Sequence, residues 1–496
     1  MRVLYIAAEC KPFSKAGGVG DVAGELPIAL KNLGVDIEIV VPGYGDTAET
    51  AYTVQYHRPE AVGLKQAETK GVPVTLVTNQ TYFATDYSAS PRPAPPFSSA
   101  ELFRGNYARP YVDSVRIPYY DDAARFSFFS EACLELIARK KPDIVHINDW
   151  MLGYLFGRMK MLNLPQKRVL TVHNMSYQGN LWRGDIARWP MEAIADDKRV
   201  GKLFADPHAD WDNVNAMRLG LELADQTNTV SPTYMKEIAK RENPAKFFEG
   251  GKGLERVCAK LAKTGRLHGI LNAFDYQFAP TDETFEAVMH DKAAMKAQLS
   301  SGFQNPAGML LGFVGRAVEQ KFRLLAEPLD GRSVLDHILA IDGVNVAIVA
   351  TGLPKYEDFL RSFSGRPNFA AIVAFDREKA RQISLGSDVF LMPSVFEPCG
   401  ITQMESMNWA TPPLVRWTGG LVDTVVPHTR PDGTGFGFDG ATPAKILQNL
   451  VKSVRDAKAM FEQAPARFRE LQRRGFQQRF LWSASAKQYE EMYGIG

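Results

Sequence analysis

Short apolar runs alternate with longer amphipathic stretches along the whole chain. The runs are rich in β-branched residues, which is typical of buried strands, and the longer stretches repeat their apolar positions at helical spacing. This pattern predicts strands at 3–7, 36–41, 72–77, 143–147, 168–172 and 226–230 in the first half, and at 309–314, 344–349, 369–374 and 388–392 in the second. The chain is therefore expected to be an α/β protein with two doubly wound parallel sheets.

Helical segments are expected between these strands. In residues 128–139, Phe129, Cys133 and Ile137 form one apolar stripe. A boundary between two domains is expected at 272–280, before a charged helical stretch at 284–299, which gives a first domain at 1–272 and a second at 273–470. Ligands of open α/β sheets bind beyond the carboxyl ends of the strands, so two facing domains would share one cleft.

Length and charge restrict the class of protein. A chain of 496 residues exceeds the size at which one core keeps growing, which also predicts at least two domains. With 58 basic and 56 acidic residues, the net charge is +2 and no long block of one sign occurs, so neither the charge nor its distribution indicates a nucleic-acid partner. The longest apolar runs fall short of the roughly 18 residues that a membrane span needs.

The cysteines and the amino terminus indicate the compartment. Four scattered cysteines (Cys10, Cys133, Cys258 and Cys399) form neither a Cys-x-x-Cys pair nor a cluster at zinc spacing. No disulfide framework or structural metal is therefore predicted. A strand-like run follows Met1 and Arg2 directly, so no cleaved signal peptide is expected and a cytoplasmic location is predicted.

A glycine-rich loop, residues 15–21, follows the first predicted strand with the sequence Lys-Ala-Gly-Gly-Val-Gly-Asp. Glycines let the backbone approach a ligand and expose its amide groups, and Lys15 adds a positive charge, so the loop suits a phosphate. The structural alternative is an ordinary glycine turn in which Asp21 caps the next helix. Spacing alone favours neither interpretation.

Polar residues close two predicted strands of the first half. Asn148, Asp149 and Trp150 follow the strand at 143–147. A buried carboxylate costs free energy unless it is paired or solvated, so Asp149 is expected to line a cleft and bind sugar hydroxyls or stabilise charge, with a capping role as the alternative. His173 and Asn174 close the strand at 168–172 in the same way. A functional and a structural role for His173 are equally compatible with this position.

Charged residues and glycine turns mark the second half. Arg316 follows a predicted strand and Lys321 comes five residues later, so the two cations could neutralise a diphosphate leaving group, although such pairs are also common on solvated helices. The segment 397–400, Glu-Pro-Cys-Gly, is predicted to open a helix that carries Glu405. Free amide groups at such a helix start suit a ligand with hydroxyls and phosphates. A further glycine turn follows at 418–420.

Two other segments call for an interpretation. Asp210, Trp211 and Asp212 have the Asp-x-Asp form associated with divalent metals on nucleotide sugars, but they precede a helical stretch at 213–223, so helix capping is favoured. The proline- and serine-rich segment 87–99 predicts an exposed or mobile loop.

Taken in order, these motifs resemble the bacterial glycogen synthase and plant starch synthase family, glycosyltransferase family 5. The segments that carry the resemblance are 15–22, 148–150, 171–174, 315–316 with 320–321, 397–405, 418–424 and 480–482. The resemblance implies a GT-B fold: two Rossmann-like domains face a central cleft, and a terminal helix at 471–496 crosses back to the first domain. It also implies transfer of glucose from a nucleotide sugar, usually ADP-glucose, to the non-reducing 4-hydroxyl of an α-1,4-glucan with retention of configuration, without a metal or cofactor.

The resemblance also assigns residues to roles, position by position. The implied catalytic residues are Asp149, His173, Arg316, Lys321 and Glu397. The implied donor-binding residues are Lys15, Gly17, Gly18, Cys399, Gly400, Glu405, Thr418, Gly419 and Gly420. The implied residues of the acceptor side and the cleft wall are Asp21, Trp150 and Asn174.

Several positions depart from the family pattern. Met151 stands where histidine or glutamine is usual, Ala273 and Phe274 replace glycine and isoleucine between the domains, Phe322 replaces a glycine beside Lys321, and Leu353 replaces an acid. Segment 103–113 follows the pattern loosely. These departures keep two alternatives open: a transferase of the same fold with another nucleotide sugar or a short acceptor, and a glucan-binding homologue that regulates a partner. Retention of the charged residues speaks against the second.

Overall fold

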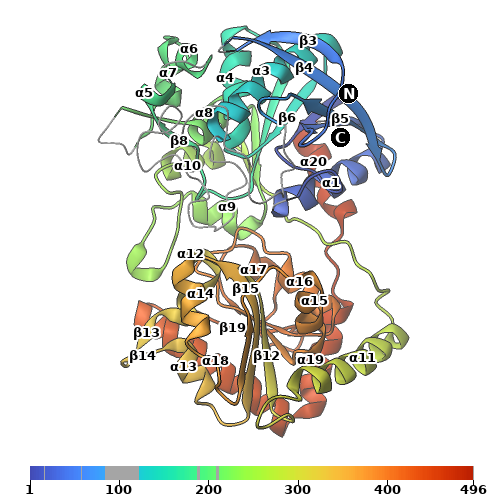
Figure 1. The fold of residues 1–496 in the computed structure, drawn as a ribbon, viewed down its shortest axis with the longest axis vertical. Coiled ribbons are helices and arrows are strands. Elements are labelled where there is room, and N and C mark those ends of the chain that lie inside the picture. The colour runs from blue at the N-terminus through green and yellow to red at the C-terminus, as the bar shows by residue number, and fades with distance from the viewer. Residues whose placement is uncertain (16, 57, 84–121, 187–189, 208–211, 495–496) are drawn as a thin grey trace.

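The computed structural model describes residues 1–15, 17–56, 58–83, 122–186, 190–207 and 212–494. Two separate sheets, each with its own hydrophobic core, form an upper and a lower lobe (Figure 1). We call the sheet built from residues 2–269, with its covering helices, the first lobe, and the sheet built from residues 309–438, with its helices, the second lobe. Ala16 and the segments 87–99 and 103–113, together with Asp210 and Trp211, lie outside the described residues.

The first sheet has nine strands in the order β11-β10-β7-β6-β1-β2-β5-β4-β3. Its strands are β1 (Arg2–Ile6), β2 (Asp36–Pro42), β3 (Thr50–Gln55), β4 (Pro59–Thr69), β5 (Val72–Thr78), β6 (Ile144–Asn148), β7 (Lys167–Val172), β10 (Gln226–Thr229) and β11 (Leu267–Gly269). The six strands predicted in this half are all present. At one edge the structure adds a feature that the sequence did not predict, because β4 pairs antiparallel with both β3 and β5.

The missed edge strands differ physically from the predicted ones. In β3 only Tyr52 and Val54 are buried, and they alternate with exposed residues. A strand with one solvated face has no continuous apolar run, so the signal that identifies buried parallel strands does not detect it.

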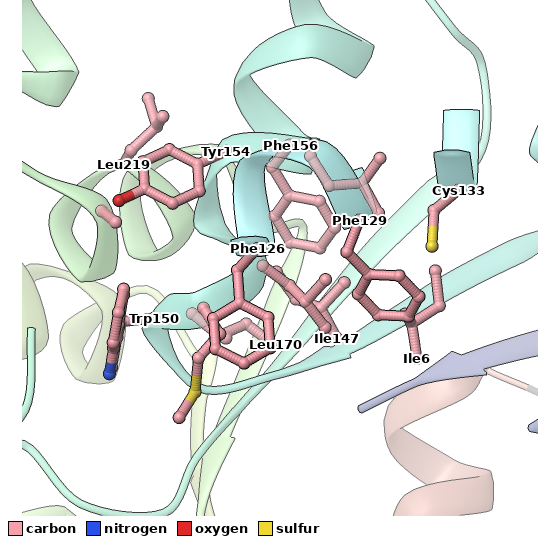
Figure 2. Packing of buried hydrophobic residues seen from close by; sticks show 14 of the residues in the cluster. Ile6, Phe126, Phe129, Cys133, Ile147, Trp150, Tyr154, Phe156, Leu170 and Leu219 are labelled. Carbon is pink, nitrogen blue, oxygen red and sulfur yellow. The ribbon is translucent and has the colours of Figure 1, made fainter. Parts of the chain in front are cut away.

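Helices cover both faces of the first sheet. On one face, α1 (Gly18–Asn32) and α20 (Trp482–Tyr493) pack against Val3 and Tyr5 of β1. On the other face, α3 (Asp122–Lys140), α4 (Gly153–Met161) and α8 (Ala216–Leu223) enclose the larger core, where Ile6 and Ile147 meet Phe129 and Phe156 (Figure 2). Successive strand side chains point to opposite faces, which is why neighbouring residues of β1 enter different cores.

Shorter elements complete the first lobe. They are η1 (Trp150–Leu152), β8 (Asn180–Trp182), α5 (Arg183–Ile186), α6 (Pro190–Asp196), α7 (Gly201–Phe204), β9 (Asn213–Asn215), α9 (Pro232–Ile238), η2 (Pro244–Lys246) and α10 (Glu255–Lys263). The helix expected at 213–223 therefore begins three residues later than predicted, after a short strand, and Asn215 is its cap: the Asn215 side chain accepts a hydrogen bond from the Arg218 amide.

The second sheet has six strands, all parallel, in the order β16-β15-β12-β17-β18-β19. They are β12 (Met309–Ala317), β15 (Val344–Gly352), β16 (Phe369–Ile372), β17 (Val389–Met392), β18 (Pro413–Arg416) and β19 (Phe436–Phe438). The surrounding elements are α11 (Asp282–Ser300), α12 (Glu319–Ala326), the hairpin β13 (Pro328–Leu329) and β14 (Arg332–Ser333), α13 (Val334–Leu339), α14 (Pro354–Arg361), α15 (Arg377–Gly386), α16 (Thr402–Asn408), α17 (Gly420–Thr424), α18 (Pro443–Gln463) and α19 (Pro465–Gln477).

Each sheet has a switch point in its parallel part, where the strand order reverses. In the first sheet the order turns between β1 and β6, and in the second it turns between β12 and β17. Loops that leave the sheet at such a switch point diverge to opposite faces and leave room for a ligand beyond the carboxyl ends of the strands. The glycine-rich loop follows β1 and Asp149 follows β6, whereas Arg316 ends β12 and Glu397 follows β17, so the predicted site residues lie at the two switch points.

The chain passes twice between the lobes, on the same side of the molecule (Figure 1). The first crossing is 270–281 and the second is 478–481, and neither contains a helix or strand. The segment 471–496, expected as one crossing helix, is thus divided between α19 and α20. The two crossings are hydrogen-bonded to each other: the Phe274 amide donates to the Phe480 carbonyl (3.1 Å) and the Phe480 amide donates to Tyr276 Oη (2.8 Å).

Candidate active site

The strand-end loops of the two lobes meet at the start of α9. Ser231 Oγ donates a hydrogen bond to the carbonyl of Pro398, which follows β17 (2.6 Å). The amide and hydroxyl of Thr233 both donate to the carboxylate of Asp423 in α17, at 2.9 and 2.8 Å. Because α9 itself follows β10, the carboxyl ends of both sheets face one another, as ligand binding between two α/β sheets requires.

Asp149 is held in a conformation that few residues adopt. Its φ of 58° and ψ of −175° lie outside the ordinary regions for a residue with a side chain, and such strain is concentrated at functional sites. Asp149 Oδ1 accepts a hydrogen bond from the His173 amide (2.7 Å). Burial raises the pKa of Asp149 to about 7, although the hydrogen bonds from the His173 and Asn174 amides act in the opposite direction. The carboxyl group therefore changes its charge near neutral pH.

His173 lies beside Asp149 and is neutral. Its ring is buried, and Nε2 lies 2.9 Å from Asn148 Oδ1. Burial lowers the pKa of His173 to about 3, so the imidazole carries one proton at neutral pH. The side chain of Asn174, unlike its amide, does not bond Asp149. Its oxygen accepts a hydrogen bond from the Ser176 amide (3.0 Å) and shapes the loop.

Lys321 and Glu397 are in direct contact at the switch point of the second sheet. Lys321 Nζ bonds Glu397 Oε2, and Ser394 Oγ donates to the same oxygen (3.1 Å). Glu397 is buried, so the ammonium group balances a charge that would otherwise be costly there. The two loops are also joined through their backbones, since the Val395 amide donates to the Gln320 carbonyl (2.7 Å).

Arg316 is an exposed cation at the site. It is exposed at the end of β12, and no side chain in the described ranges forms an ion pair or hydrogen bond with its guanidinium group. Lys15 is different, because its Nζ lies 2.6 Å from Asp21 Oδ1. The helix-cap alternative for Asp21 is wrong, since α1 begins at Gly18 with Gly17 as its cap and Asp21 lies inside its first turn.

The glycine-rich loop already holds an anionic group. The amides of Gly17 and Gly20 both donate to the carboxylate of Glu9, which follows β1, and the three distances are 3.1 to 3.2 Å. The position of a Cβ on Gly18 is open, with nothing within 4 Å. Sequence reasoning missed Glu9, although the signal was the same as for Asp149: an acid directly after an apolar strand.

The glycine turn at 418–420 packs against the segment that carries Glu397. Gly419 has a φ of +46°, and a Cβ there would lie 1.9 Å from the Glu397 carbonyl oxygen, so only glycine fits. The Gly419 amide donates to Glu237 Oε1 (2.9 Å), and Thr418 Oγ1 lies 3.3 Å from the same oxygen. Two groups predicted to bind the donor are therefore occupied by a carboxylate of the first lobe. Nothing in the sequence motif indicated Glu237.

The helix after Glu397 begins later than predicted. Its first residue is Thr402, and the intervening Cys399 is buried while Gly400 has a φ of +75°. Glu405 lies in the first turn of α16 and is mostly buried, which raises its pKa; the charge of Lys15 across the interface lowers it. The predicted donor-side groups of both lobes thus influence one another electrostatically.

Trp150 does not line the facing loops. Its side chain is 2% exposed and packs in the core of the first lobe beside Phe126, with the ring centroids 6.3 Å apart (Figure 2). A Cβ on Gly179 would come within 2.2 Å of the Trp150 ring, so this glycine permits the packing. The ring thus packs into the apolar face of the sheet, and a role of Trp150 in shaping the cleft stays a prediction.

The departures from the family pattern are mostly core residues. Met151 belongs to the core of the first lobe, and Ala273 is buried in the crossing. Phe322 is fully buried in the second lobe, 5.5 Å from the Phe313 ring and 5.4 Å from the Tyr356 ring. Its side chain points away from Lys321, since neighbouring helical residues occupy different faces. The phenylalanine thus fills a core position.

Phe375 is an exposed aromatic residue that sequence reasoning missed. It lies in the loop between β16 and α15, at the carboxyl edge of the second sheet, and is 64% exposed. The Arg377 guanidinium carbon lies 5.7 Å from its ring centroid. An apolar ring at the end of a predicted strand, beside the polar start of a helix, was the available signal.

No group of three or more His, Cys, Asp or Glu side chains in the described ranges is arranged to hold a metal ion. Among the helices of the described part of the chain, none combines the length and the apolar character of a bilayer span.

Known proteins resemble this chain over its full length. A family model, the starch synthase catalytic domain, matches residues 2–260. The glycogen synthase of Lactococcus lactis is 32% identical, with 99% of both chains covered. The glycogen synthase of Exiguobacterium sibiricum is 33% identical, with 100% of this chain and 99% of the other covered.

Two solved structures are similar to this chain in fold. The catalytic domain of starch synthase IV from Arabidopsis thaliana, bound to ADP and acarbose, has a TM-score of 0.76 and 25% identity, with 100% of this chain and 99% of that chain covered. Sucrose-phosphate synthase from Thermosynechococcus elongatus has a TM-score of 0.57 and 15% identity with the same coverage, which is a likeness of fold alone.

Proposed function

Because this chain belongs to the glycogen synthase and starch synthase family, we propose that it transfers glucose from ADP-glucose to the non-reducing 4-hydroxyl of an α-1,4-glucan, with retention of configuration. The family expected from the ordered motifs is confirmed, and so are the two-lobed GT-B fold and the glycosyltransferase class. The choice of ADP-glucose is supported by the similar starch synthase IV structure, which was determined with bound ADP.

The contact between Lys321 and Glu397 at the second switch point carries the proposal. Departure of a nucleoside diphosphate leaves negative charge on the phosphate oxygens, and a preorganised cation at that position stabilises the charge as it develops. Glu397 holds the Lys321 ammonium group in place, and the exposed Arg316 supplies a second cation near the end of β12. These two cations supply the charge that a metal ion provides elsewhere, so we propose a reaction without a metal or cofactor.

Asp149 and His173 are proposed to act on the sugar side. They lie together at the switch point of the first sheet, and the neutral His173 ring cannot repel a cationic group near the sugar. Asp149 can accept a hydrogen bond from a sugar hydroxyl or stabilise positive charge near the anomeric carbon when it is ionised. Phe375 offers an exposed flat ring to a nucleobase at the other end of the donor.

The cellular setting is proposed on the basis of the thiols. All four cysteines are free and buried, which is compatible with a reducing compartment such as the cytoplasm. Domain limits of 1–272 and 273–470, with the remaining segment returning to the first lobe, are proposed because each sheet has its own core.

The proposal is tested by measuring ADP release from ADP-glucose in the presence and absence of glycogen. Acceptor-dependent release is expected, with elongated chains that an α-1,4-specific hydrolase shortens again. UDP-glucose and maltooligosaccharides, assayed in parallel, distinguish the donor base and the acceptor length. Absence of acceptor-dependent release with either nucleotide sugar would contradict the proposal.

A further inference from the structure

A layer of buried polar side chains separates helix α20 from the carboxyl ends of β6, β7 and β10. We call it the buried polar layer, and every member is at most 9% exposed: Tyr5, His146, Asn148, Thr171, His173, Asn228, Tyr489 and Tyr493. Buried polar groups cost free energy unless they are hydrogen-bonded. The presence of eight such groups beside a functional site therefore indicates a specific arrangement of hydrogen bonds. The last two tyrosines belong to α20, which reaches this position from the second lobe.

In each hydrogen bond near α20, the donor and the acceptor can be assigned. Asn228 Nδ2 donates to Tyr489 Oη (2.8 Å), so Asn228 Oδ1 accepts from Thr171 Oγ1 (2.7 Å). The threonine proton is then in use, and His146 Nε2 must donate to Thr171 Oγ1 (2.7 Å). His146 Nδ1 is consequently unprotonated and accepts from Tyr493 Oη (2.6 Å). Burial lowers the pKa of His146 to about 3, so its ring carries a single proton.

The donor and the acceptor can also be assigned in each hydrogen bond near His173. Asn148 Nδ2 donates to the Ile6 carbonyl (3.0 Å), which can only accept, and this fixes the orientation of the amide group. Asn148 Oδ1 therefore accepts from both Tyr5 Oη (3.0 Å) and His173 Nε2 (2.9 Å). The proton of His173 resides on Nε2. No described residue donates a hydrogen bond to the Nδ1 atom of His173.

Tyr5 joins the two halves of the layer. Its ring packs edge-on against the His146 ring, with the centroids 4.8 Å apart, while its hydroxyl group bonds Asn148. His146 and Asn148 are two residues apart on β6 and lie on one face of the sheet, where Tyr493 of α20 contacts His146. Thr171 lies on β7 and His173 follows its last residue; their side chains bond His146 and Asn148 on this same face. A change at α20 can thus reach His173 from Tyr493 through three intervening side chains, His146, Tyr5 and Asn148.

We propose that the buried polar layer fixes His173 as the Nε2-protonated tautomer, and that Asn148, Tyr5 and Tyr493 are positioning residues that act through it. Asn148 selects the tautomer, Tyr5 holds Asn148, and Tyr493 holds the His146 ring on which Tyr5 packs. The tautomer leaves Nδ1 with a lone pair. That this lone pair serves the transfer of glucose rests on the proposed function, whereas the tautomer itself does not.

The tautomer is measured directly by nitrogen NMR of the full chain labelled with 15N-histidine. The chain has 8 histidines, and the signals of His173 are assigned by their loss in His173→Gln. A protonated Nε2 and an unprotonated Nδ1 are expected in the wild-type protein without ligand. A protonated Nδ1 at His173 would overturn the proposal. The spectrum requires no activity, so an inactive protein would refute the proposed function and leave this result standing.

Variants test the positioning residues. Asn148→Leu removes the acceptor, so a mixture of His173 tautomers is expected, with kcat lower by about 10- to 100-fold, the range known for groups that orient metal-bound histidines. Tyr5→Phe and Tyr493→Phe each delete one hydroxyl group, and kcat is expected to fall by about 3- to 10-fold, with the KM for donor within about 2-fold.

Tyr52→Phe is the matched control. The Tyr52 hydroxyl is also buried and donates to the Ala132 carbonyl (2.8 Å), but it lies outside the layer. Its loss is expected to change kcat by less than about 2-fold and to leave the His173 signals in place. If Tyr5→Phe and Tyr493→Phe match Tyr52→Phe in both the spectrum and kcat, their positioning role is refuted. If Asn148→Leu does not fold, the wild-type spectrum and the two tyrosine variants still decide.

Discussion

Replacing Lys321 with methionine removes a charge while keeping most of the side-chain volume. The Lys321 ammonium group forms an ion pair with Glu397. The Glu397 side chain is 6% exposed and the Lys321 side chain is 21% exposed. After the substitution, Glu397 keeps the Ser394 hydrogen bond and loses its ion pair. The variant therefore tests both the stability of the site and its chemistry.

Two magnitudes follow. Removing one partner of a buried ion pair costs about 3–5 kcal/mol of stability. The lower end applies here because Lys321 is partly solvated. Loss of one preorganised group that stabilises transition-state charge costs about 2.7–4 kcal/mol, which corresponds to a fall in kcat of about 10²- to 10³-fold. Binding of the glucan acceptor alone is expected to change little, because Lys321 is proposed to act on the leaving diphosphate.

Lys296→Met separates the two effects. Lys296 Nζ lies 2.6 Å from Asp388 Oδ2, and the two side chains are 18% and 9% exposed, so this pair matches the first in burial. Asp388 precedes β17, at the amino end of the sheet away from the facing loops. Chemical denaturation should show a similar loss of stability for both variants, whereas ADP release should fall only in Lys321→Met.

The reasoning would be refuted if both variants lost turnover equally, or if Lys321→Met kept turnover within about 10-fold of the wild type. An equal loss of glucan binding and turnover in Lys321→Met would instead favour a glucan-binding homologue that regulates a partner.

Other parts of the site predict separate changes. Glu237→Gln removes the negative charge that occupies the Gly419 amide, so the KM for donor should fall about 2- to 5-fold, and unchanged ADP affinity by calorimetry would contradict this. Phe375→Ala should raise the KM for donor about 5- to 10-fold, equivalent to about 1 kcal/mol of stacking, while the KM for acceptor stays constant. Because burial raises the pKa of Asp149 to about 7, kcat/KM should fall as pH drops through 7 and the carboxylate gains a proton; this limb should be absent from the residual activity of Asp149→Asn. EDTA should leave the rate of ADP release unchanged, and loss of activity that is restored by a divalent cation would show that Arg316 and Lys321 are not sufficient.

The sequence predicted the parts of the fold that depend on continuous apolar runs. Strands β1, β6 and β12 are buried on both faces, so their signal is strong, and the order of motifs placed Asp149 and Glu397 at strand ends. Strand β3 was missed because only one of its faces is buried.

The local partners in the site were beyond the sequence. That Glu9 holds the glycine-rich loop and that Glu237 holds Gly419 depends on how loops distant along the chain meet, and no spacing encodes this. Trp150 shows the same limit, since an aromatic residue after a strand can turn toward a ligand or into the core. The tautomer of His173 requires the orientation of one amide group, which only coordinates provide.

The paired crossings restrict how the lobes can move. Two peptide segments run side by side and are hydrogen-bonded through Phe274 and Phe480, so together they can act as a hinge between the lobes. Bending about the line through both segments needs small backbone rotations in each, whereas a twist would have to stretch one segment against the other. A rotation of the lobes about that line would change the separation of Arg316 and Asp149 while the hydrogen bonds between the two crossings stay formed.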